Sequence, residues 1–392
     1  MKKLIFAILM MTLLTSCGSS AATPIAITPN PSAPPNDAFV TTSCATIYPT
    51  LPDNTKFPGS VVLDDYKSTS HLFLKNLENG SEIDMSTAND TVSDIRISPD
   101  HKSAAYQIGN PKANQWSIMV TDANGVRTSE YKWPTFYTLG NWINNDNILM
   151  MAYPPFVAFN PSTKQQEKSF DYPDFPTYSL DKPNNYIIAL NPTMDRAIYK
   201  STNDRASLYD ITNKKIIATV DNHPNPSVIA AWAPDGSQAA VVGSIMLTTQ
   251  LSDRSEDLFG VTPSGQVKRL THLTDHYGKR VQFSKAGLSW SPDSRHVSFW
   301  MINLQNGYKY WELGVADVTT QKTTAYCIAN QYENKLNSTH YLSAPAWSPD
   351  GKQLLLENRY DDESSRVLIL DLATSNAYQI EENKYPGGWI IP

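Results

Sequence analysis

The stretch PAWSPDGKQLLLE (residues 345–357) contains the pattern that decides the fold. An apolar strand end leads into Ser-Pro-Asp-Gly, and a polar pair then precedes a second apolar run. Proline presets φ for a turn, aspartate can accept a hydrogen bond from the backbone two residues later, and glycine supplies a positive φ. The pattern therefore predicts two strands joined by a tight hairpin turn.

Three further copies of this pattern lie earlier in the chain: IRISPDHKSAAYQ (95–107), AAWAPDGSQAAVV (230–242) and LSWSPDSRHVSFW (288–300). The turn aspartates of the four copies are Asp100, Asp235, Asp293 and Asp350. They could be read as a ring of carboxylates, but their place in a hairpin turn favours a structural role. The residue before each turn marks the register of the repeat, and these residues are Ile97, Trp232, Trp290 and Trp347.

The spacing of the register residues predicts two more repeats of degenerate sequence. The gap between Ile97 and Trp232 is about three times the length of a repeat of 40 to 50 residues. Trp142, in GNWINNDNILMMAY, and Leu190, in IIALNPTMDRAIYK, divide this gap into 45, 48 and 42 residues. A last register residue, Trp389, comes 42 residues after Trp347 and ends the chain within three residues. The final strand therefore has no hairpin partner after it.

The start of the repeat region supplies the partners that this last strand lacks. Residues 60–66, 71–77 and 81–86 read as three strands with no first strand before them. Three strands from the start and one from the end would complete a four-stranded blade and close a ring, which leaves only short edges. We therefore predict an all-β, seven-bladed β-propeller over residues 58–392, in which the N- and C-terminal strands share one blade. Six blades is the alternative count.

The W-S-P-D-G repeats of residues 230–242, 288–300 and 345–357 resemble those of bacterial TolB-like, or WD40-like (PD40), propellers. The resemblance implies four-stranded blades around a central channel. TolB carries an additional α/β domain before its propeller, whereas a Pro-rich segment precedes the repeats here, so a Pal-binding role does not carry over. The repeats also resemble the propeller half of dipeptidyl-peptidase-type enzymes, but the chain has no G-x-S-x-G motif for a hydrolase nucleophile.

The first residues, MKKLIFAILMMTLLTSC, predict export and anchoring. Two lysines precede an apolar run of 11 residues, which is too short to span a bilayer and fits a secretory signal. Leu-Thr-Ser-Cys resembles the bacterial lipobox, which implies a signal peptide over residues 1–16 and a diacylglycerol on Cys17; a secretory signal with a chance cysteine is the alternative. Residues 17–57 then form a Pro-rich tether. We expect a lipid-anchored protein of the bacterial cell envelope.

Two further cysteines, Cys44 and Cys327, are compatible with a disulfide in an exported protein. The alternative is that each is an isolated small core residue.

The overall composition limits the kinds of partner that the protein can bind. The formal net charge is −6 with no long Lys/Arg run. Because phosphate binding depends on clustered positive charge, nucleic acid is not an expected partner.

Candidate ligand-binding residues are sparse, and each has a plainer interpretation. His272 and His276, with Asp275, have an H-x3-H spacing that can suit zinc, but no third ligand is evident and a polar loop is the simpler interpretation. Two clusters could supply oxygens to Ca²⁺ but are also typical of solvated acidic loops: Asn358, Asp361, Asp362 and Glu363, and the pair Asp64 and Asp65. We predict no metal and no cofactor.

Aromatic residues in predicted connecting loops could recognise a peptide or sugar, or could pack between blades: Trp133, Phe136 and Tyr137, and Tyr308, Tyr310 and Trp311. The leading hypothesis is a non-enzymatic binding or scaffold lipoprotein that holds a protein, peptide or glycan on one face of the ring or at the channel mouth. The alternative is an extracytoplasmic polysaccharide lyase or hydrolase with its site at the central channel. A convergent cluster of channel-lining side chains would separate the two.

Overall fold

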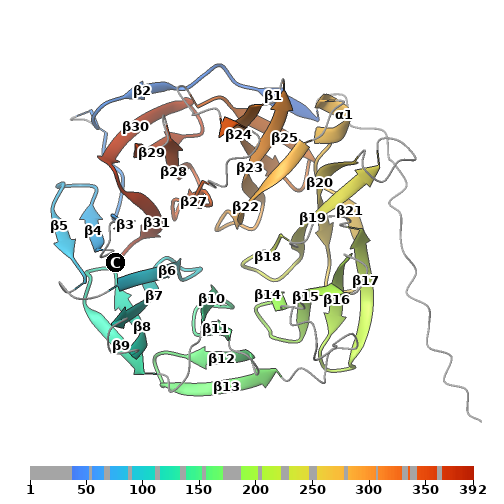
Figure 1. Cartoon of the computed structure of the whole chain (residues 1–392), viewed down its shortest axis with the longest axis horizontal. Helices are drawn as coiled ribbons and strands as arrows, with labels where there is room; N and C mark the ends of the chain where they lie inside the picture. The colour runs from blue at the N-terminus through green and yellow to red at the C-terminus, as the bar shows by residue number, and fades with distance from the viewer. Residues whose placement is uncertain are drawn as a thin grey trace, which may run out of the picture.

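The described residues of the chain form seven β-sheets arranged as a ring. The structure is a computed structural model that describes residues 38–52, 55–65, 71–86, 91–110, 115–132, 138–151, 156–170, 187–201, 205–221, 229–246, 254–277, 281–305, 308–328, 334–335, 342–359 and 364–392. Figure 1 looks down the ring and shows each sheet as one blade, with its first strand nearest the centre. The prediction of a seven-bladed propeller is confirmed, and the alternative count of six is wrong.

Each of the first three full blades is a four-stranded antiparallel meander. Blade 1 contains β6 (Thr91–Ile97), β7 (Ser103–Asn110), β8 (Gln115–Asp122) and β9 (Arg127–Lys132). Blade 2 contains β10 (Thr138–Trp142), β11 (Ile148–Met151), β12 (Phe156–Asn160) and β13 (Gln165–Phe170). Blade 3 contains β14 (Ile187–Leu190), β15 (Arg196–Ser201), β16 (Arg205–Asp210) and β17 (Lys215–Asp221).

The next three full blades repeat this arrangement. Blade 4 contains β18 (Ala230–Trp232), β19 (Ala239–Met246), β20 (Arg254–Val261) and β21 (Val267–Arg269), and the short helix α1 (Leu273–Tyr277) follows it. Blade 5 contains β22 (Val281–Trp290), β23 (His296–Gln305), β24 (Tyr308–Asp317) and β25 (Lys322–Tyr326), with β26 (Asn334–Lys335) paired to β24. Blade 6 contains β27 (Ala346–Trp347), β28 (Gln353–Arg359), β29 (Ser365–Asp371) and β30 (Asn376–Glu382).

The seventh blade is assembled from the two ends of the ring, as predicted. Its innermost strand is β31 (Tyr385–Ile390), which pairs antiparallel with β3 (Ser60–Asp64). β4 (Leu72–Asn76) and β5 (Glu82–Asp84) complete this closing blade. The sheet hydrogen bonds between the two ends replace a covalent link, so they close the ring.

The core is divided into seven clusters, one at each joint between neighbouring blades. Central strands contribute to the joints on both of their faces; β28, for example, is buried along six consecutive residues. The sequence accordingly reads QLLLE there rather than alternating apolar and polar residues. Each apolar side chain buried in this way contributes roughly 1.5–3 kcal/mol, so the joints hold the blades together.

A lead-in segment (residues 38–52) runs along the outer rim of blades 5 and 6, where Figure 1 shows it in blue. Its strand β1 (Phe39–Thr41) pairs parallel with β25, and β2 (Thr46–Tyr48) pairs parallel with β30. Between the two strands, a disulfide joins Cys44 to Cys327, with their Cα atoms 4.3 Å apart. Sequence reasoning placed these residues in the tether and did not predict the two added strands.

Candidate functional site

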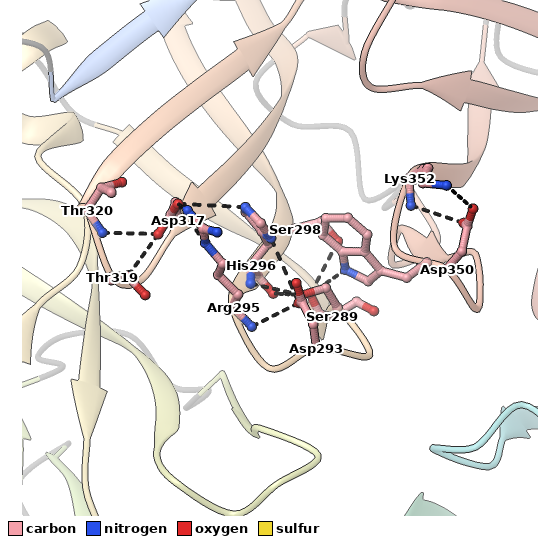
Figure 2. Close-up of polar contacts among 12 residues, drawn as sticks. Ser289, Asp293, Arg295, His296, Ser298, Asp317, Thr319, Thr320, Asp350 and Lys352 are labelled. Carbon is pink, nitrogen blue, oxygen red and sulfur yellow. Dashed lines mark hydrogen bonds and ion pairs between the residues drawn. The ribbon is translucent and has the colours of Figure 1, made fainter.

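The turn aspartates all lie between the first and second strands of their blades, where each has a backbone partner. Asp100, Asp235, Asp293 and Asp350 each accept a hydrogen bond from the N–H two residues later, over 2.9–3.2 Å. Figure 2 shows this arrangement for Asp293 and Asp350. Burial raises the pKa of Asp293, but the hydrogen bonds from the Ser291 hydroxyl and the Arg295 N–H, together with the charges of His296 and Arg295, hold the pKa below its ordinary value. These carboxylates therefore stabilise turns.

The two candidate zinc ligands point to different partners. His272 is buried, and its Nδ1 lies 3.0 Å from Asp275. His276 stacks on Phe39 of the lead-in segment, with the ring centroids 3.9 Å apart. Within the described part of the chain, no three His, Cys, Asp or Glu side chains are grouped closely enough to hold a metal ion.

Several other candidates can be placed only in part. Asp361, Asp362 and Glu363 lie outside the described residues, as do Trp133, Phe136 and Tyr137. Asp65 accepts the His71 N–H over 2.8 Å. The assignment of Trp311 to a loop is wrong, because β24 begins at Tyr308 and buries Trp311 at the joint between blades 5 and 6.

The ring encloses a central cavity of about 840 Å³, which is a size typical of ligand sites. The innermost strands of six blades line it: β6, β10, β18, β22, β27 and β31. Four of these strands, β6, β10, β22 and β31, contain a register irregularity shortly before the register residue. Bulges of this kind re-aim side chains, and here they bring Asp94, Asn141 and Lys285 to the cavity wall.

The two ends of the cavity differ in chemistry. The Ser/Ala-Pro-Asp turns bring Pro99, Pro234 and Pro292 to one end. Tyr385 begins β31, whereas Arg359 ends the neighbouring β28. Each innermost strand ends at its turn, so its first residue lies at the opposite end of the cavity. The second strand runs back from the turn, so its last residue lies at that opposite end as well. Asp64, which lies opposite Tyr385 in the β3–β31 pairing, is also there, so we call this end the polar mouth.

Both signs of charge meet at the cavity wall. Arg359 lies 3.3 Å from Glu357 and donates from Nη2 to the Tyr385 hydroxyl over 3.2 Å. Arg96 on β6 lies 3.8 Å from Asp94 and donates from Nη1 to the Ile95 carbonyl. Burial lowers the pKa of Arg96, and Asp94 offsets part of this effect. The arrangement can pair with anionic groups through guanidinium N–H donors and with hydroxyl or ammonium groups through carboxylates.

Of this mouth, sequence reasoning singled out only Asp64, and as a possible Ca²⁺ ligand. Lys285, Glu357, Arg359 and Tyr385 come from three different strands, the innermost strands β22 and β31 and the second strand β28, so no local motif contains them. One signal was available: Glu357 and Arg359 are charged residues two apart that follow the apolar run of three leucines in β28, and residues two apart share a face.

Among the described residues, none of the helices combines the length and the apolar character that a membrane span requires.

Comparison with protein-family models finds no match, and no curated protein matches the chain. Among solved structures, TolB from Acinetobacter baumannii is similar, with a TM-score of 0.42 and 13% identity. That alignment covers 84% of this chain and 66% of the TolB chain, so this chain spans just under two thirds of TolB. The β-propeller domain of Myceliophteria thermophila Cps50 (Swd1) aligns over 78% of this chain and 94% of that chain, with a TM-score of 0.46 and 10% identity. Both similarities concern the fold.

Proposed function

We propose that this protein is a lipid-anchored binding protein of the bacterial cell envelope, and that its ligand enters the central cavity at the polar mouth. The observation that carries the proposal is the cavity itself: about 840 Å³, enclosed by the innermost strands, with Lys285, Arg359 and Tyr385 on its wall. Rigid strands position these groups, as a binding site requires. The lipobox-like sequence ending at Cys17 supports the anchor.

Membrane fractionation tests the anchor. The wild-type protein is expected in the membrane fraction, and Cys17→Ser is expected in the soluble fraction because the thiol that receives the lipid is removed. Ser20→Ala serves as the control, since it changes a nearby residue of the predicted tether and leaves Cys17 and the disulfide in place. Membrane attachment of Cys17→Ser equal to that of the wild type refutes the anchor.

Blocking the cavity tests the binding site. On the Cys17→Ser background, Lys285→Cys provides a thiol on the cavity wall that a bulky maleimide can label. Val126→Cys is the matched control, because Val126 is 58% exposed in the turn between β8 and β9. Both labelled proteins are applied to glycan and peptide arrays. We expect ligands of the unlabelled protein to be lost after labelling at position 285 and retained after labelling at position 126; ligands that survive both labels refute a site in the cavity.

A further inference from the structure

Arg359 at the polar mouth is held in place from the core of the protein. Trp300, whose side chain is fully buried, donates its indole N–H to the carbonyl oxygen of Ser343 over 3.0 Å. Ser343 in turn donates its backbone N–H and its hydroxyl to one oxygen of Glu357, over 2.7 and 2.8 Å. The other oxygen of Glu357 accepts from Nε of Arg359. This series of contacts fixes the orientation of the guanidinium group before any ligand binds.

The guanidinium group has donor capacity that the described protein atoms do not use. Arginine carries five N–H donors. In the described ranges, Arg359 uses one for Glu357 and one for the hydroxyl of Tyr385. Its side chain is only 12% exposed, and it lines the central cavity. The remaining N–H groups are therefore offered to whatever occupies that cavity.

The neighbouring groups limit the class of ligand. A planar, pre-oriented guanidinium matches a carboxylate in bidentate geometry. Arg96 and the exposed Lys285 add further positive charge to the cavity wall. Asp64 and Asp94 also line the cavity, and carboxylates accept hydrogen bonds from hydroxyl or ammonium groups. A ligand that carries both kinds of group uses both sets of partners.

We propose that Arg359 anchors the carboxylate of a small organic acid that also carries hydroxyl or ammonium groups, which is the chemistry of sugar acids and amino acids. Glu357 is then a positioning residue, because one of its oxygens accepts from Nε of the guanidinium group and so holds its orientation. This inference rests on the proposed function, since it names the ligand class of the same cavity.

Isothermal titration calorimetry of the soluble Cys17→Ser protein tests the proposal. The probes are D-glucuronate and L-glutamate, which distinguish the two sources of carboxylate, and D-glucose is the neutral control. We expect one of the acids to bind and glucose to give no heat. Arg359→Gln should weaken binding of that acid about 10- to 100-fold, the factor for losing a charged hydrogen-bond partner.

Two variants separate binding from folding. Arg366→Gln removes the same charge from β29, where Arg366 donates to Asn358 outside the cavity lining, and should bind as the wild type does. Arg359→Lys keeps the charge but loses the bidentate donors, so it should also bind weakly at an unchanged melting temperature. The proposal is overturned if neither acid binds the wild-type protein, or if Arg359→Gln and Arg359→Lys bind as well as the wild type. Labelling Lys285→Cys gives a further outcome. If the array ligands that it displaces are neutral, the carboxylate proposal is overturned and the proposed function still stands.

Discussion

Trp347 donates its indole N–H to the carbonyl oxygen of Ser289, 3.0 Å away across the joint between blades 5 and 6. The acceptor is the residue just before the register residue of the preceding blade. Trp142, Trp232 and Trp290 make the corresponding bond to Arg96, Ala189 and Ala231, over 2.9–3.3 Å. The repeated tryptophan therefore connects each of these blades to the blade before it, by a directional bond as well as by packing.

Replacing this donor should weaken the joint. Trp347→Phe retains most of the buried ring but removes the indole N–H from the Ser289 carbonyl, which still accepts the Ser298 hydroxyl over 3.3 Å. We therefore expect a loss of about 0.5–1.5 kcal/mol in the free energy of unfolding. Chemical denaturation measures the loss. The matched control is Trp311→Phe, which makes the same substitution on the other blade of this joint, where Trp311 packs in the apolar cluster. Equal losses for the two variants would show that ring volume, and not the hydrogen bond, stabilises the joint.

The disulfide should stabilise the ring through the lead-in segment. Cys44 and Cys327 are separated by 283 residues, so the bridge removes much of the freedom of the unfolded chain. Cys327→Ser is expected to lower the free energy of unfolding by about 2–5 kcal/mol. Non-reducing mass mapping of the mature protein should find the Cys44–Cys327 peptide pair. Two free thiols in that experiment would contradict the bridge.

The blade count could be predicted because the turn that joins the first two strands carries its own chemistry. The fourth residue of the turn has a positive φ in five blades, whether it is Gly236 or Gly351 or a non-glycine such as His101 or Ser294. Pro and Asp therefore identify the turn even where glycine is absent. The lead-in strands could not be predicted, since three-residue strands paired to a distant rim leave no periodic pattern.

The polar mouth was beyond prediction for a different reason. Its charged residues converge only because the ring closes and because bulges turn residues of β6 and β22 toward the axis. A single sequence does not show where a bulge will form. The hairpin turns, in contrast, depend on residues next to one another in the chain, so they can be read directly.

Ring closure depends on a close approach between β31 and blade 1. Gly388 has a φ of 141°, and a Cβ placed on it would lie 2.3 Å from Cγ1 of Ile97. Gly388→Ala should therefore destabilise the protein through both strain and collision. Gly80→Ala is the control, because Gly80 also has a positive φ but has no atom within 4 Å of the added Cβ. We expect a clearly larger drop in melting temperature for Gly388→Ala, and similar drops for the two variants would contradict close packing at the closure.

His101 should make ring closure sensitive to acid. Its Nδ1 lies 2.8 Å from the carbonyl oxygen of Trp389, and its own carbonyl accepts the N–H of Ile391. Burial lowers the pKa of His101 below its ordinary value of 6.5, although the bond to Trp389 and the charge of Asp100 offset part of this effect. The unfolded chain thus binds the proton more readily than the folded protein. The free energy of unfolding therefore has its full value above about pH 6.5. It falls as the pH drops toward the pKa of the folded protein, and below that pKa the loss is constant.

His101→Asn removes the titration, and asparagine tolerates the positive φ of 60° at this position. Between about pH 5 and about pH 7.5, a range that spans the ordinary pKa of about 6.5, the free energy of unfolding should change with pH in the wild type and change less in His101→Asn. Denaturation curves measure this difference. Parallel slopes for the two proteins would assign the acid sensitivity to other groups.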